Sequence, residues 1–295
     1  MNVGCAAPLT PDRLTEEKNL NMLQELNISL IGSGNMAEAM IKGLLDKGMA
    51  RPSNLFASDP VDERRQIMQE HYHLEVTSDN RLAAQRGDVV ILAVKPQVLP
   101  HVMSDIRGMV RSSALVISIV AGVPIQTISQ GIEHEAIVRV IPNTPAMVGQ
   151  GMSVWTATSA VSQQQREQAR LILRSLGEEM EVEREDYIDM ATAVSGSGPA
   201  YVFLFIEALT DAAVHLGFSR PMAERIVLQT LQGAVALAKE SSAHPAELRN
   251  KVTSPAGTTA EALYQLEKGG FRAVISKAVW AAYQKSRSLG GLSNR

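Results

Sequence analysis

Short apolar runs alternate with amphipathic segments over the first two thirds of the chain. Residues 28–31 form an apolar run that predicts a buried strand, and helical spacing of apolar residues begins at Met36. The further predicted strands are residues 54–58, 74–77, 88–94, 115–120, 137–141, 153–156 and 181–183. The run 88–94 is almost uninterrupted, which is typical of a strand buried on both faces. This alternation predicts an α/β domain with a parallel-rich sheet.

Near Glu185 the alternation ends, and the rest of the chain has a helical pattern. Residues 201–217 contain no lysine or arginine, and residues 223–238 are nearly as apolar. Helices that are apolar all round must be buried, and one small domain can hardly bury both. We therefore expect an α/β domain at 28–184 and an all-helical domain at 185–295, with these two helices in a subunit interface rather than in an intrachain core.

The turn after the first strand has the sequence Gly32-Ser33-Gly34-Asn35-Met36-Ala37. A strand, Gly-x-Gly-x-x-Ala and a helix form the turn that binds the pyrophosphate of a dinucleotide. Gly32 permits the tight turn, Gly34 lets the backbone approach the phosphates, and Ala37 keeps the helix close to the strand. The free N–H groups and the positive dipole end of the helix then face the anion. An ordinary βα turn has the same glycines, but the alternation around it favours a Rossmann-like dinucleotide-binding domain.

The end of the second strand bears on the choice between NAD and NADP. Asp59 stands where an acid commonly binds the adenosine ribose 2′-hydroxyl, which favours NAD. Ser58 precedes it, and Arg64 and Arg65 follow on the next helix, where they could instead hold a 2′-phosphate. These residues leave both cofactors open.

Three consecutive predicted strands end in loops of small, proline-containing or amide-bearing residues. The loops are Lys95-Pro96, Ala121-Gly122 and Pro142-Asn143-Thr144-Pro145. The carboxyl ends of strands in an open parallel sheet line the ligand crevice, so we expect a flat nicotinamide ring to lie against these loops. Lys95 is either a ligand for phosphate or substrate, or a solvated loop lysine.

Two loops of the helical part combine small residues with hydroxyls at a helix start. Residues 195–199 (Ser-Gly-Ser-Gly-Pro) lead into the first apolar helix, and residues 253–259 (Thr-Ser-Pro-Ala-Gly-Thr-Thr) lead into a helix predicted at 260–267. The hydroxyls and exposed N–H groups of the second loop make an anion site sized for a carboxylate. Taken alone, each loop is also compatible with a simple helix entry.

Charge and composition exclude several classes. Acidic and basic residues nearly balance, 31 against 28, so we expect no nucleic-acid or membrane partner. No apolar run reaches membrane-spanning length. No metal-ligand spacing and no nucleophile–base arrangement is present, and none of the six histidines lies in a motif.

The single cysteine, Cys5, excludes an internal disulfide and indicates a reducing, cytoplasmic location. Residues 1–27 are polar and form an N-terminal extension, which we expect to be flexible or to carry a short helix at 20–26. Its acidic residues argue against a mitochondrial transit peptide, and it lacks the apolar core of a secretory signal.

Taken together, these motifs resemble those of the pyrroline-5-carboxylate reductase family over about residues 28–289. The motifs are Ile31-Gly32-Ser33-Gly34-Asn35-Met36-Ala37, Ala93-Val94-Lys95-Pro96, Ala121-Gly122, Pro142-Asn143-Thr144-Pro145, Ser195-Gly196-Ser197-Gly198-Pro199-Ala200-Tyr201 and Ser254-Pro255-Ala256-Gly257-Thr258-Thr259. The last two are the most specific to the family.

The resemblance implies reduction of the C=N bond of 1-pyrroline-5-carboxylate to L-proline, the final step of proline biosynthesis. It implies NAD(P)H as cofactor, with NADPH favoured and NADH the alternative, and a helical domain that intertwines in a homodimer, with dimers often forming decamers. By position, the substrate would contact Gly257, Thr258 and Thr259, and Thr259 is the expected catalytic hydroxyl near the ring nitrogen. The residues expected to bind the cofactor are Gly32, Ser33, Gly34, Asn35, Met36, Ala37, Ser58, Asn80, Ala93, Val94, Lys95, Pro96, Val120, Ala121 and Gly122.

Three positions depart from the family pattern. Ala256 stands where glycine is usual, Lys251 stands where many members have a neutral residue, and Asp59 ends the second strand. Two other interpretations account for less of the chain. A 3-hydroxyacid or 6-phosphogluconate dehydrogenase-like enzyme would carry a lysine on the helix entering the second domain, and residues 199–217 have none. A non-catalytic nucleotide-sensing module would explain the glycine turn but not residues 254–259.

Overall fold

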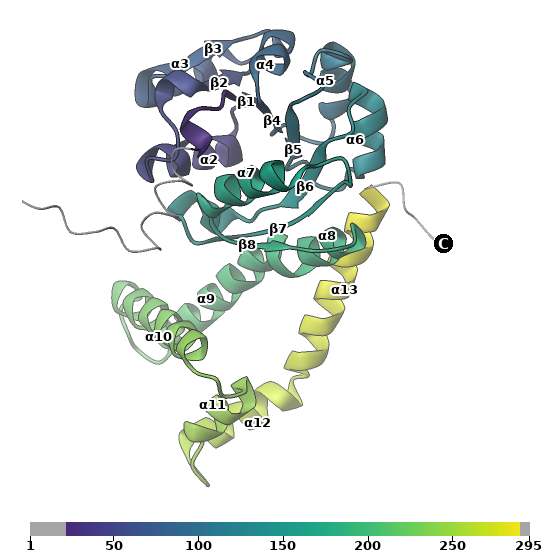
Figure 1. The fold of residues 1–295 in the computed structure, drawn as a ribbon. Coiled ribbons are helices and arrows are strands. Elements are labelled where there is room, and N and C mark those ends of the chain that lie inside the picture. Colours follow the sequence, from purple (N-terminus) through teal and green to yellow (C-terminus); the bar gives the residue numbers. More distant parts are fainter. Residues whose placement is uncertain (1–21, 290–295) are drawn as a thin grey trace, which may run out of the picture. The chain divides into compact units, whose positions relative to one another are not determined.

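A computed structural model describes residues 22–289 of the chain (Figure 1). The chain divides into two compact units. Of the described residues, one contains 22–196 and 283–289, and the other contains 197–282. The first is an α/β unit and the second is helical.

The α/β unit is built on an eight-stranded sheet with the strand order β3-β2-β1-β4-β5-β6-β7-β8. Strands β1 to β6 are parallel to one another, β7 is antiparallel to β6, and β8 is parallel to β7. Their bounds are β1 Ile28–Ile31, β2 Leu55–Ser58, β3 Glu75–Thr77, β4 Val89–Leu92, β5 Leu115–Ser118, β6 Ile137–Ile141, β7 Gly151–Ala157 and β8 Gly177–Glu181. The predicted parallel-rich sheet is confirmed, and the direction of winding reverses between β1 and β4.

Helices cover both faces of this sheet (Figure 1). On one face, α2 (Asn35–Asp46), α3 (Asp62–Tyr72) and α7 (Gln163–Arg174) pack on one apolar cluster. On the other face, α4 (Asn80–Arg86), α5 (Leu99–Ile106) and α6 (Ile125–Ile132) pack on a second cluster. Strand β4 is apolar at every position because both of its faces are buried. Val89 and Ile91 lie in the first cluster, whereas Val90 and Leu92 lie in the second. Two short 3-10 turns, η1 (Pro52–Asn54) and η2 (Thr144–Val148), complete the unit.

The described end of the N-terminal extension packs against the α/β unit. Residues 22–24 form a helical turn, and the Leu23 side chain is fully buried in the first apolar cluster. The Asn54 side-chain amide donates to the carbonyls of Leu23 and Leu26 at 3.0 and 2.6 Å. The remainder of the predicted extension, residues 1–21, lies outside the described residues.

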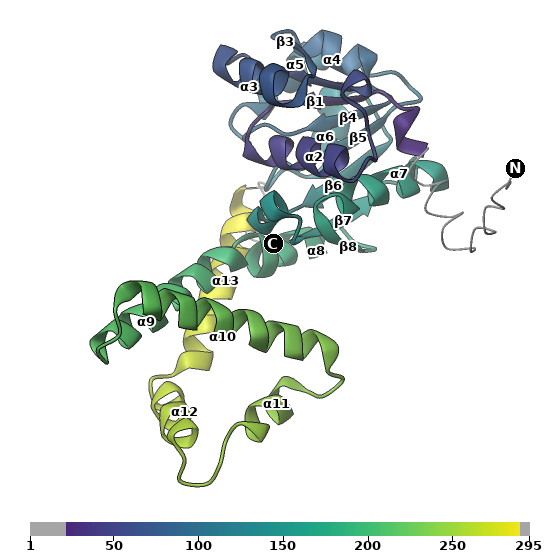
Figure 2. The same ribbon diagram turned by 90° about the vertical axis from the view of Figure 1, so that its left-hand side faces the viewer.

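The helical unit contains α9 to α12 and most of α13 (Figure 2). Before it, α8 (Asp186–Ala191) and a π-helical turn, η3 (Thr192–Gly196), still belong to the α/β unit. By compactness the helical unit thus begins at residue 197, and the end of α13 belongs to the first unit. The bounds are α9 Gly198–His215, α10 Arg220–Glu240, α11 Pro245–Lys251, α12 Thr258–Lys268 and α13 Phe271–Leu289.

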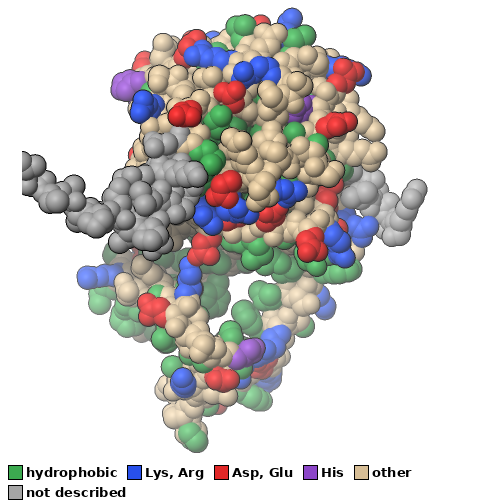
Figure 3. All heavy atoms as spheres, in the orientation of Figure 1, with side chains coloured by type: hydrophobic (Ala, Val, Ile, Leu, Met, Phe, Trp, Pro, Cys, Tyr) green, Lys and Arg blue, Asp and Glu red, His purple; other side chains and the backbone are tan. Residues whose placement is uncertain are grey.

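Apolar side chains lie uncovered on the helices of this unit. In α9, Phe203 and Leu204 are 62% and 66% exposed, and in α10 Leu228 is 52% exposed. Figure 3 shows such side chains gathered on the helical unit. One chain by itself does not cover these faces, as the composition of α9 and α10 predicts.

One helical stretch is longer than the sequence pattern suggests. Helix α8, the π-helical turn and α9 form one continuous helix, Asp186–His215, that is long and apolar enough to cross a membrane by length and composition. The expectation that no apolar run reaches this length is therefore corrected, because the helix continues through the glycine-rich sequence 195–199. A single helix of this kind is weak evidence for a membrane protein, and 6% of its most apolar window is buried in the chain.

A buried charge cluster ties α8 and the end of α13 to the sheet. The Arg139 side chain on β6 is 3% exposed and donates to Glu185 Oε1 at 2.7 Å and to Asp189 Oδ1 at 3.2 Å. Asp189 also accepts a 2.9 Å hydrogen bond from the Ser286 hydroxyl on α13. A buried arginine is stable only where carboxylates compensate its charge, so this cluster fixes where α8 leaves the sheet.

We expect Asp189→Asn to lower the free energy of unfolding by about 3 kcal/mol, because it leaves the buried Arg139 charge partly uncompensated. Urea denaturation at one protein concentration measures this effect. Asp186→Asn is the matched control, since Asp186 pairs with Arg184 and both side chains are about half exposed or more. The control should unfold almost like the wild type, and equal losses in both variants would contradict the role of the cluster.

Candidate functional site

The glycine turn lies where the sheet reverses its winding. Gly32 follows β1 directly and has a φ of +93°, in the region that favours glycine. A Cβ atom added to it would lie 2.7 Å from the Ala93 carbonyl oxygen and 2.8 Å from a Val94 methyl group. The structure thus brings together two of the predicted cofactor motifs, at the topological switch point where open α/β sheets bind their ligands.

The helix that follows the turn presents free N–H groups. Gly34 is the N-cap of α2, and no side chain caps this helix start. The first intrahelical hydrogen bond runs from Glu38 N to Gly34 O at 2.9 Å, so the N–H groups of Asn35, Met36 and Ala37 have no intrahelical acceptor. A Cβ atom at Gly34 would meet nothing within 4 Å. This open, donor-rich helix start fits a pyrophosphate.

The charged residues considered for ribose recognition all have partners in the protein. The Asp59 carboxylate accepts from Ser33 N, Ser33 Oγ and Val61 N. Arg64 donates to the Ser33 carbonyl and to Glu38. Arg65 donates to the carbonyls of Asp59 and Pro60 and pairs with Asp62.

The other predicted cofactor residues lie at the ends of β2, β4 and β5, except Asn80, which begins α4 after β3. The fully buried Ser58 hydroxyl donates to Asn80 Oδ1 at 3.0 Å, which joins two of them directly. Val120 is 2% exposed and Lys95 is exposed. Gly122 has a φ of +72°. The parallel register of β1, β2, β4 and β5 places the four loops after these strands at one edge.

An interaction at the end of β6 was not predicted. Asn143 accepts from Met152 N at 2.9 Å, which orients its amide, and it donates to Ser195 Oγ and Ser195 O at 3.2 and 3.3 Å. Ser195 lies in the π-helical turn, and such turns are frequent at functional sites. The amide in Pro-Asn-Thr-Pro was the available signal, but its partner is 52 residues away in the sequence.

In the helical unit, the loop 253–259 forms a turn followed by an uncapped helix start. Gly257 N donates to Ser254 O at 3.1 Å, and no side chain caps α12 at Gly257. A Cβ atom at Gly257 would lie 2.3 Å from Ser254 Oγ. Among the described residues, the Thr258 and Thr259 hydroxyls have no hydrogen-bond partner. The loop therefore offers hydroxyl and N–H donors to a ligand.

Two of the departures from the family pattern lie in or beside this loop. Ala256 has a φ of +58°, a left-handed conformation that is unusual for alanine. It occupies the third position of the Ser254-Pro255-Ala256-Gly257 turn, where a positive φ favours glycine. Lys251 is exposed at the end of α11.

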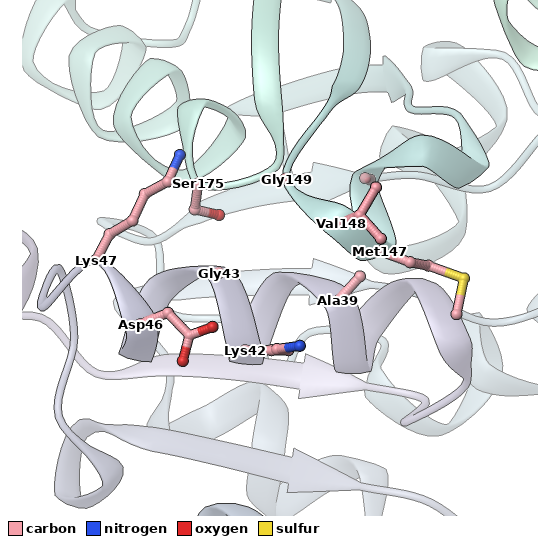
Figure 4. Close-up of a pocket in the computed structure, with 10 residues that line it drawn as sticks. Ala39, Lys42, Gly43, Asp46, Lys47, Met147, Val148, Gly149 and Ser175 are labelled. Atoms are coloured by element: carbon pink, nitrogen blue, oxygen red, sulfur yellow. The ribbon is translucent and has the colours of Figure 1, made fainter. Parts of the chain in front are cut away.

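A cavity of about 320 Å³ lies along the second half of α2 (Figure 4). Lys42 and Asp46 of α2 and its C-cap residue Lys47 line one side, and Met147 and Val148 of η2 line the other. None of the predicted cofactor residues lines this cavity. It is separate from the glycine turn, which lies at the other end of the same helix.

The fold and the glycine turn define a dinucleotide-binding protein, and a family match identifies its α/β part as that of an oxidoreductase. A family model described as NADP oxidoreductase, coenzyme F420-dependent, matches residues 27–122. A second model, described as pyrroline-5-carboxylate reductase dimerisation, matches residues 185–289.

Full-length relatives identify the family. Pyrroline-5-carboxylate reductases of Synechocystis sp. and Pseudomonas aeruginosa are 44% and 41% identical, over 90% and 89% of this chain and 98% and 96% of theirs. A crystal structure of pyrroline carboxylate reductase from Plasmodium falciparum with NADP bound has a TM-score of 0.83 at 34% identity, covering 91% of this chain and 99% of that one. The chain belongs to the pyrroline-5-carboxylate reductase family, and its residues 185–289 form a dimerisation domain.

The two glycines of the turn should respond differently to substitution. Gly32→Ala should lose both stability and dinucleotide binding, since the left-handed conformation alone costs alanine about 1–2 kcal/mol and the Cβ atom overlaps Ala93. Gly34→Ala should keep the wild-type melting temperature and bind dinucleotide about tenfold more weakly, because its methyl group blocks close hydrogen bonds to the phosphates. Thermal unfolding and dinucleotide titration test the pair. Unchanged affinity in Gly34→Ala would show that the phosphates do not approach this turn.

Ala256→Gly should raise stability by up to about 1 kcal/mol, because relief of the left-handed strain exceeds the added entropy of the unfolded chain. Ala246→Gly is the control, in a right-handed position of α11, and should lose about 0.5–1 kcal/mol. The melting temperatures of both variants test this prediction. A lower melting temperature in both variants would contradict strain at Ala256.

Proposed function

We propose that this protein reduces the C=N bond of 1-pyrroline-5-carboxylate to L-proline with NADPH as its preferred cofactor. The observation that carries the proposal is the open glycine turn at the switch point, in a chain whose full-length relatives bear the name of this reaction. The NADP-bound relative supports NADPH over NADH. The cofactor residues proposed are those expected from the sequence, from Gly32 to Gly122.

The reaction depends mainly on how the protein positions the substrate ring against the cofactor ring. The bound cofactor supplies a hydride to the imine carbon, and a protonated imine is already electrophilic, so the protein needs no strong acid. Alignment of the two rings then contributes most of the rate. We propose that the N–H groups and hydroxyls of Thr258 and Thr259, with Gly257, hold the substrate carboxylate. The two threonine N–H groups have no intrahelical acceptor, because the first hydrogen bond of α12 runs from Glu261 N to Gly257 O.

We further propose a cytoplasmic homodimer that assembles into higher oligomers, including a decamer. The exposed apolar side chains of α9 and α10 and the match to a dimerisation model support the dimer. The single cysteine supports the compartment.

Substrate-dependent oxidation of NADPH tests the proposed function. The purified protein should oxidise NADPH with pyrroline-5-carboxylate and should not do so with 3-oxo acids. Turnover of a 3-oxo acid without turnover of the cyclic imine would overturn the proposal.

Thr259→Ala should raise the KM for pyrroline-5-carboxylate about tenfold or more, because a hydrogen bond to a charged group contributes about 1.5–3 kcal/mol. Turnover should fall as well if the hydroxyl contacts the ring nitrogen. The melting temperature and the affinity for NADPH should stay the same, since this hydroxyl caps no helix. Thr253→Ala is the control, because its hydroxyl bonds the Arg249 carbonyl at 2.7 Å. It should lose stability, whereas wild-type kinetics in Thr259→Ala would exclude a substrate contact.

A further inference from the structure

Ser33, the residue between the two glycines of the turn, is held by its neighbours on three sides. Its N–H and its hydroxyl both donate to Asp59 Oδ2, at 2.8 and 3.0 Å. Its carbonyl accepts a 2.8 Å hydrogen bond from Arg64 Nε. Ser33 is fully buried. The peptide planes on both sides of Ser33 are therefore fixed, and they set the direction in which the following N–H groups point.

The two anchoring side chains are themselves held in place. Asp59 is 9% exposed, and its second oxygen accepts from Val61 N at 2.9 Å. Arg64 donates to Glu38 at 2.6 Å, and Glu38 accepts from the Tyr72 hydroxyl at 3.0 Å. Burial raises the pKa of Glu38, but the bonds from Arg64 and Tyr72 outweigh it and lower the pKa below its usual value. Glu38 is thus a carboxylate at neutral pH and keeps Arg64 oriented.

We propose that Asp59 and Arg64 are positioning residues that hold the pyrophosphate turn, and that neither one selects between NADH and NADPH at the ribose. This inference rests on the proposed function only in taking a nicotinamide dinucleotide as the ligand. It departs from the expectation that an acid at the end of the second strand reads the ribose 2′-hydroxyl. Both carboxylate oxygens of Asp59 are instead bonded to the turn and to the start of α3.

A positioning role and a cofactor-selecting role predict different changes in the affinities for NADH and NADPH. NADH and NADPH share the pyrophosphate, so a misplaced turn weakens the binding of both by the same factor. A ribose-selecting Asp59 would act differently, because its loss would weaken NADH binding and strengthen NADPH binding. A phosphate-binding Arg64 would also act differently, because its loss would weaken NADPH binding alone.

The test is a fluorescence titration of the full-length protein with NADPH and with NADH, in the absence of substrate. In Asp59→Asn and in Arg64→Gln we expect both dissociation constants to rise about tenfold, the effect of losing one hydrogen bond to a charged group. The ratio of the two constants should stay within about twofold of the wild-type ratio. A change of that ratio in the selective direction would overturn the proposal for the residue concerned.

Two further variants separate the role of the turn from other effects. Ser33→Ala removes one hydrogen bond with little change in volume, and it should weaken both cofactors equally and by less than Asp59→Asn. Asp62→Asn removes the same charge three residues away on the exposed start of α3, and it should leave both constants unchanged. If Asp62→Asn matched Asp59→Asn, the effect would be a long-range charge effect and the proposal would fail. Turnover of pyrroline-5-carboxylate by the same wild-type preparation reports on the proposed function separately, because the titrations contain no substrate.

Discussion

The lack of space for a side chain at Gly32, beside the Ala93 carbonyl, is the constraint on which the dinucleotide site depends. The sheet winds in one direction from β1 to β3 and in the other from β4 to β6, so the loops after β1 and β4 diverge and leave a crevice between them. A side chain at position 32 would occupy the space of the Ala93 carbonyl. The absence of that side chain lets two strands lie side by side while a helix with three free N–H groups begins above them.

Two buried polar clusters hold the elements around this crevice. The cluster of Asp59, Ser33 and Arg64 connects the glycine turn to α3. The cluster of Arg139, Glu185 and Asp189 connects the sheet to α8. Each contains a buried charged side chain, Asp59 in the first and Arg139 in the second, and an unpaired charge in such a place is costly. Each cluster therefore specifies one arrangement of the elements it joins.

The helical unit differs from the sheet unit, because many of its apolar side chains stay exposed to solvent in a single copy of the chain. Phe203 and Leu204 remain more than half exposed, and the family defines residues 185–289 as a dimerisation domain. The hydrophobic effect that stabilises the sheet unit within one chain thus acts between chains here. In the same unit, Ala256 keeps a left-handed backbone, and strain of this kind is common in ligand-binding loops.

The sequence by itself determined the elements with strong periodicity and the motifs that depend on a short stretch of chain. Strand β6 has its predicted bounds, and β1 and the start of α2 enclose the glycine turn as predicted. The cofactor loops could be placed at one edge, because parallel strands end on the same side of a sheet. Only the tertiary structure decided which side chains pair across the sequence. Asp59 reaches back 26 residues to Ser33, and Asn143 reaches 52 residues forward to Ser195. Such pairs depend on the twist and packing of whole elements. No sequence pattern between the two partners indicates that they are in contact.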